Sequence, residues 1–168
     1  MVACAVVGCS SQSSSEVRAA DVYDTAIRWL ASERADDPEP LRVFIEPRGE
    51  GSSIGLDVQA EVIKLSADAA DVRFIDTRDE ALIETDSTVA PPDPDDDEPD
   101  AAVRAVRDEG MLVRLGPVIE DGTRLNLEID RWVSDEHFAT LEFVLRDSDG
   151  EWQVVGSPVV TGSLDLDE

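Results

Sequence analysis

LEFVLRDSDGEWQV, residues 141–154, carries the clearest structural signal in the chain. Apolar side chains alternate with mostly polar ones on both sides of Asp149-Gly150, which is the pattern of two half-buried strands. Asp-Gly between two such runs strongly favours a tight hairpin turn. This segment therefore predicts a β-hairpin with one buried and one solvated face.

Two more alternating runs precede this hairpin, and a second Asp-Gly pair lies between them at Asp121-Gly122. Together the runs predict a four-stranded antiparallel meander in the C-terminal third of the chain, with strands at 111–115, 125–129, 141–145 and 152–154.

The first half has a different periodicity. Apolar residues repeat every three or four positions over 17–33, which predicts an amphipathic helix, with Ser13 and Glu16 spaced as a capping box before it. Residues 41–47 and 71–76 predict strands. The apolar residues of 54–65 fit both the alternation of a strand and the three-to-four-residue spacing of a helix. The Gln, Ala, Glu and Lys content of this segment favours a helix. We expect an α+β fold in which the N-terminal helix and this short strand-helix-strand region pack on the meander.

Charge is the unusual feature of the composition. The 168 residues include 39 Asp and Glu but 14 Lys and Arg, which gives a formal net charge of −25. Such a surface disfavours nucleic acid, because no basic stripe is present to bind phosphates. An anionic bilayer would also repel it, so any membrane association needs a covalent anchor or a spanning segment. No apolar run reaches the roughly 18 residues that a spanning helix needs.

The acids concentrate in one place: residues 91–100 consist of proline and acidic residues alone. A segment of this kind buries no apolar surface and repels itself, so we expect a disordered acidic loop at about 86–102 within a single α+β domain, residues 16–168.

Both cysteines, Cys4 and Cys9, precede this domain, which excludes a disulfide framework, a zinc cluster or a cysteine nucleophile within it. Val6-Val7-Gly8-Cys9, followed by a Ser/Gln tract, resembles the lipobox of bacterial lipoproteins. The resemblance implies that Cys9 is the lipid attachment site and that residues 1–15 are a truncated signal and flexible tether. The basic and apolar part of such a signal is missing, and a start upstream of Met1 would supply it.

The layout of a helix followed by a meander is loosely similar to cystatin-like and NTF2-like domains, and to exported proteins of high-GC bacteria. In an NTF2-like cone, Tyr23, Trp29, Asp130 and Glu142 would lie near the mouth of a pocket. Such residues more often belong to a core edge or a solvated strand face.

No catalytic constellation stands out. His137, the only histidine, falls between two predicted strands without a specified nucleophile, and no G-x-S-x-G elbow occurs. Asp147-Ser148-Asp149-Gly150 lacks the ligand spacing of a calcium loop and favours a turn. Phosphate-binding glycine loops are absent. We therefore expect no enzyme, no cofactor and no metal site.

The sequence predicts a membrane-anchored extracytoplasmic lipoprotein domain that binds or assists an envelope protein, held to the membrane through lipid on Cys9. Two alternatives remain open: an NTF2-like small-molecule-binding protein or enzyme, and a soluble cytoplasmic acidic protein of a salt-adapted cell.

Overall fold

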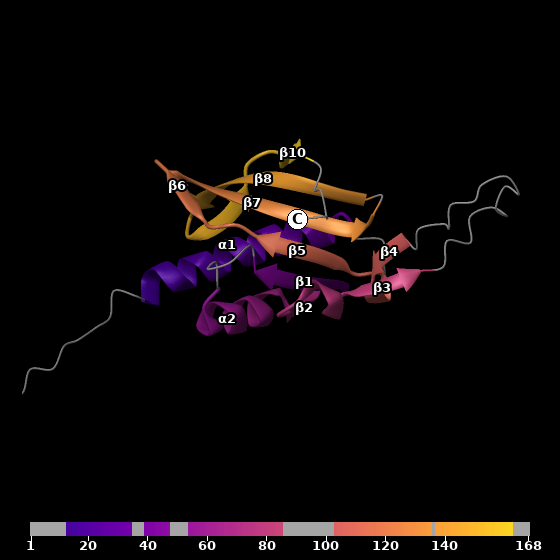
Figure 1. The fold of residues 1–168 in the computed structure, drawn as a ribbon. Helices are drawn as coiled ribbons and strands as arrows, with labels where there is room; N and C mark the ends of the chain where they lie inside the picture. The colour runs from indigo at the N-terminus through magenta and orange to yellow at the C-terminus, as the bar shows by residue number, and fades with distance from the viewer. Residues whose placement is uncertain (1–12, 35–38, 48–53, 86–102, 136, 163–168) are drawn as a thin grey trace, which may run out of the picture.

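The fold is α+β, with two helices and a strongly curled, largely antiparallel sheet resembling half a barrel (Figure 1). The computed structural model describes residues 13–34, 39–47, 54–85, 103–135 and 137–162. In chain order the elements are α1 (Ser13–Ser32), β1 (Leu41–Pro47), α2 (Leu56–Ser66), β2 (Ala70–Phe74), the 3-10 turn η1 (Arg78–Glu80), β3 (Leu82–Thr85), β4 (Val103–Val106), the 3-10 turn η2 (Arg107–Glu109), β5 (Met111–Leu115), β6 (Ile119–Asp121), β7 (Arg124–Ser134), β8 (His137–Ser148), β9 (Glu151–Val154) and β10 (Val159–Gly162).

The predicted meander is present as β5, β7, β8 and β9, and its neighbouring strands pair antiparallel. At the turn between β8 and β9, Asp149 and Gly150 both have positive φ, 59° and 89°, as a tight hairpin turn requires. The Asp147 carboxylate accepts a hydrogen bond from the Gly150 backbone N–H at 2.8 Å. The other Asp-Gly pair differs from the expectation, because it joins the short strand β6, rather than β5, to β7.

The expectation that the strand-helix-strand region packs on the meander is wrong. Its two strands instead extend the same sheet, in the order β10-β8-β7-β5-β1-β2, and β1 pairs in parallel with both β2 and β5. The sheet has ten strands in the described part of the chain, and β3, β4, β6 and β10 were not predicted. Parallel neighbours need a crossover connection, and α2 supplies it between β1 and β2.

Helix α1 covers the inner face of the sheet, as its apolar stripe predicts. It begins at Ser13, four residues before the expected start. Trp29 packs edge-on against Phe143 of β8, with ring centroids 5.4 Å apart. The side chains that form the inner core include Val22, Ala26, Ile27, Leu30, Val43, Ile45, Val62, Val113, Leu127, Ile129, Leu141, Phe143 and Leu145.

The outer face of the sheet is not entirely exposed to solvent, although the sequence predicted one buried and one solvated face. At the end of the sheet near the β3–β4 hairpin, a second apolar cluster forms on this face; its buried members are Phe44, Ile75, Ala81, Val106, Leu112 and Trp132. Strands β3 and β4 pair antiparallel, with Thr85 opposite Val103. The acidic segment 86–102 therefore connects the two strands of a hairpin, although the segment itself lies outside the described residues.

Candidate functional site

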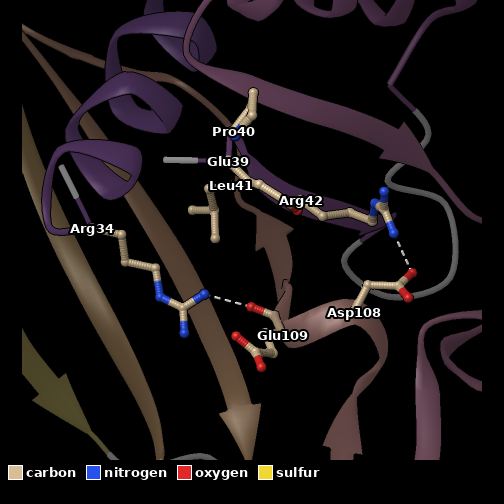
Figure 2. Close-up of a pocket in the computed structure, with 7 residues that line it drawn as sticks. All are labelled: Arg34, Glu39, Pro40, Leu41, Arg42, Asp108 and Glu109. Atoms are coloured by element: carbon tan, nitrogen blue, oxygen red, sulfur yellow. Dashed lines mark hydrogen bonds and ion pairs between the residues drawn. The ribbon is translucent and has the colours of Figure 1, made fainter. Parts of the chain in front are cut away.

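A polar cavity of about 600 Å³ opens where α1 ends, β1 begins and η2 turns (Figure 2). Its volume falls in the range of small-molecule sites, about 300–1,000 Å³. Two regions that are distant in sequence, 34–42 and 108–109, form its wall, and the lining residues are Arg34, Glu39, Pro40, Leu41, Arg42, Asp108 and Glu109.

The backbone of η2 determines the shape of one wall. Asp108 and Glu109 both adopt left-handed conformations, with φ of 57° and 52°, which side chains other than glycine rarely do. Gly110 follows, and a Cβ atom there would lie 2.9 Å from the Arg42 carbonyl oxygen. The close approach of η2 to β1 therefore depends on this glycine, and strained backbone of this kind is common at functional sites.

Two arginines in the cavity have different surroundings. Arg42 donates from Nε to the Asp71 carboxylate at 3.0 Å and from Nη1 to Asp108, and these hydrogen bonds raise the pKa of its guanidinium. Arg34 instead donates to the backbone carbonyl oxygen of Glu109. Figure 2 shows Arg34 and Glu109 at the cavity, with the Arg34 guanidinium directed at the Glu109 carbonyl oxygen.

The described lining offers charges and hydrogen bonds, but no hydroxyl, thiol, imidazole or amine. Arginine donates to carboxylates and phosphates, while Asp and Glu accept from cations. This arrangement suits recognition of a charged ligand better than nucleophilic chemistry.

The four residues proposed for an NTF2-like pocket mouth do not come together. Tyr23 lies on the inner side, 7% exposed, and its hydroxyl donates to the Gly116 carbonyl oxygen at 3.1 Å. Trp29 is partly buried and packs against the inner core. Asp130 and Glu142 occupy positions on the opposite face, since they alternate with the inner residues Ile129 and Leu141.

Asp130 belongs to a row of polar residues that sequence reasoning missed. Glu46, Arg114, Asp130 and Thr140 are consecutive register partners across β1, β5, β7 and β8, and we call them the outer charged row. Arg114 donates to Glu46 at 2.8 Å, and Thr140 donates to Asp130, which is 3% exposed, at 3.0 Å. Arg78 of η1 lies 3.6 Å from Glu46. These mutual contacts satisfy the row and fit a structural role beside the outer apolar cluster.

His137 is exposed at the start of β8, and its Nδ1 lies 3.1 Å from the Ser134 hydroxyl. The neighbouring Asp135 carboxylate accepts from the Arg104 backbone N–H at 2.9 Å. The geometry therefore gives His137 a turn contact with a serine, while the nearby carboxylate binds another strand.

Cys9 and the Val6–Cys9 motif lie outside the described residues, so the lipid attachment site stays a prediction. In the described ranges, no helix is long and apolar enough to cross a bilayer, and no group of three or more His, Cys, Asp or Glu residues is placed to hold a metal ion.

No sequence pattern marked the cavity, because its arginines and acids are separated along the chain and acids are common throughout. Comparisons with protein-family models, with curated proteins and with solved structures found no match to this chain.

Proposed function

We propose that this protein is a lipid-anchored binding module on the extracytoplasmic face of a cell membrane, and that it assists an envelope component. The observation that carries the proposal is Val6-Val7-Gly8-Cys9 followed by the Ser/Gln tract. A diacylglyceryl group on the Cys9 thiol, together with a further acyl chain, would hold the chain stably, whereas one acyl chain binds only marginally.

The position of the cavity supports this arrangement. Three residues separate Cys9 from Ser13, where α1 begins. Helix α1 has 20 residues and therefore spans about 30 Å. The cavity lies beyond its C-terminal end, at Arg34, so α1 separates the cavity from the anchored end. In Figure 1 the start of α1 lies on the left, and the β3–β4 hairpin lies on the right.

The charge of the domain agrees with an anchor of this kind. A net charge of −25 repels an anionic bilayer surface, so the protein surface by itself would not hold the membrane. The same repulsion would keep the domain standing away from the lipid headgroups, with the cavity directed toward the surrounding medium.

Metabolic labelling tests the anchor. The gene, together with its natural upstream region, is expressed in bacteria supplied with an alkyne-tagged fatty acid. The Cys4→Ser variant is a matched control, because the chain has two cysteines and both lie near its start. We expect label on the wild type and on Cys4→Ser, and none on Cys9→Ser. Equal labelling of Cys9→Ser, or no labelling of the wild type, would overturn the proposal.

A further inference from the structure

We infer that the cavity beside Arg34 binds a small zwitterion of the α-amino-acid class, with the ligand carboxylate on Arg34 and its ammonium group on Glu109. The inference rests on the proposed role as a binding module and names the ligand class of that module.

The Arg34 guanidinium has more donors than its described contact uses. A guanidinium carries five N–H donors. Within the described residues, Arg34 uses its donors only on the Glu109 carbonyl oxygen, whereas Arg42 binds both Asp71 and Asp108. The guanidinium of Arg34 therefore retains donors for a carboxylate, which it would bind through two parallel hydrogen bonds.

Glu109 supplies the second group of the proposed site. Its backbone is left-handed, which lets one residue present both its carbonyl oxygen and its side chain toward the cavity (Figure 2). In the part of the chain that the structure describes, no Arg, Lys or His forms an ion pair with the Glu109 carboxylate. Glu109 is exposed and its carbonyl oxygen contacts Arg34, so these two residues offer a ligand a positive and a negative group in the same cavity.

The net charge of the protein favours a ligand without net charge. A free anion approaching this protein is repelled by the net charge of −25, and a free cation is attracted to the whole acidic surface without selectivity. A zwitterion has no net charge, so neither effect acts on it. Its two charges are recognised where a cation and an acid lie near each other, and Arg34 and Glu109 both line this cavity.

Calorimetric titration with three groups of probes tests the inference. The zwitterions are L-alanine, L-leucine and L-phenylalanine. The single-charge analogues are 4-methylpentanoate, which lacks the ammonium group of leucine, and L-leucinamide, which lacks its carboxylate. We expect saturable binding of at least one zwitterion, with an affinity at least about tenfold higher than that of either analogue when leucine binds.

Two variants locate the binding. Arg34→Gln and Glu109→Gln should each weaken binding of that zwitterion at least about tenfold, and circular dichroism should show an unchanged fold. Arg146→Gln, which removes an exposed arginine of β8, should bind as the wild type does.

Three results would overturn the inference: no zwitterion saturates at concentrations on the order of 1 mM, 4-methylpentanoate binds as tightly as leucine, or the Arg34 and Glu109 variants bind as the wild type does. The lipid-labelling result is independent of these outcomes, so failure of the ligand assignment and failure of the anchor are distinguishable.

Discussion

Asp108 and Glu109 are the most strained residues of the candidate site. Left-handed backbone costs a residue with a Cβ atom about 1–2 kcal/mol. The conformation persists because Arg42 binds the Asp108 carboxylate, Arg34 binds the Glu109 carbonyl oxygen and Gly110 lets the turn approach β1. The wall of the cavity therefore depends on contacts made by its own arginines.

Substitution at Glu109 measures this strain. We expect Glu109→Gly to be about 0.5–1 kcal/mol more stable than Glu109→Ala, because relief of the left-handed conformation outweighs the extra unfolded-state entropy of glycine. The two variants lose the same carboxylate, so their difference in urea unfolding isolates the backbone. If the alanine variant is as stable as the glycine variant or more stable, the turn is unstrained.

Substitution at Gly110 measures how closely the turn packs. In Gly110→Ala the new methyl group would meet the Arg42 carbonyl oxygen at 2.9 Å and the Arg107 carbonyl oxygen at 3.1 Å, so we expect a loss of about 1–3 kcal/mol. Gly162→Ala is the matched control, since no atom lies within 4 Å of its added Cβ. Equal thermal unfolding of both variants would contradict the packing described here.

At the scale of elements, Arg28 joins the two helices. It donates to Asp24 of α1 at 2.9 Å, to Asp68 just beyond α2 at 2.5 Å, and to the Leu65 carbonyl oxygen near the end of α2. The hydrogen bond to Arg28 lowers the pKa of Asp68, and the hydrogen bonds to Asp68 and Asp24 raise the pKa of Arg28. A cation at the end of a helix also complements the helix dipole.

This junction predicts a pH dependence. Because the folded pKa of Asp68 is depressed below its ordinary value, its contribution is complete above about pH 4 and is lost as the pH falls through the folded pKa. We expect Asp68→Asn to lose less stability than the wild type on acidification below about pH 4, as measured by urea unfolding. Asp57→Asn, an exposed acid at the start of α2, controls for removal of a charge. Parallel acid profiles of Asp68→Asn and wild type would refute the assignment.

The β3–β4 hairpin predicts that the acidic segment is dispensable for folding. Thr85 and Val103 face each other in register, so an Asn-Gly turn in place of residues 86–102 can close the hairpin. Shortening the loop lowers the entropic cost of closing it during folding. We therefore expect the free energy of unfolding to increase by about 2 kcal/mol. Replacing the segment with a Gly/Ser linker of equal length is the control, with little gain expected. Loss of the fold in the short-turn variant would show that the segment is structural.

At the scale of the whole molecule, the net charge of −25 makes the surface repel itself. Raising the salt concentration from about 0.01 M to 1 M shortens the Debye length from about 30 Å to 3 Å. We expect the unfolding temperature to rise by about 4 °C or more in sodium chloride, and equally in potassium chloride if screening is the cause. A flat salt profile would contradict this expectation. A chain that stays unfolded at low salt would instead favour a protein of a salt-adapted cell.

The sequence predicted the elements whose side-chain period is long enough to read. Strands β7 and β8 bury alternate residues at 125–129 and 141–145, the stretches that the sequence predicted, and α1 carries a continuous apolar stripe, whereas the two strands extend further, to Ser134 and Ser148. Strands β3 and β4 have four residues each and flank the acidic segment, and all four residues of β10 are exposed. Such short or unburied strands carry no readable period.

The pairing of the strands and the candidate site could not be predicted from the sequence, for a related reason. The parallel contact of β1 with β5 joins Val43 to Met111 and has no local signature. Arg34, Arg42 and Glu109 meet only through that contact, and a left-handed Glu leaves no signal of the kind that a glycine gives. The Cys9 motif shows the opposite case, because it is readable in the sequence and lies outside the described structure.

The place of β1 between β2 and β5 has a consequence for the order of folding. The hairpin of β7 and β8 joins residues close in sequence, whereas β1 must find β5 across the whole middle of the chain. Closing a longer loop costs more entropy, and contacts between distant residues slow folding. We therefore expect the C-terminal hairpins to form early and β1 to dock late. Because the cavity needs β1 against η2, it would be among the last parts of the molecule to assemble and among the first to open.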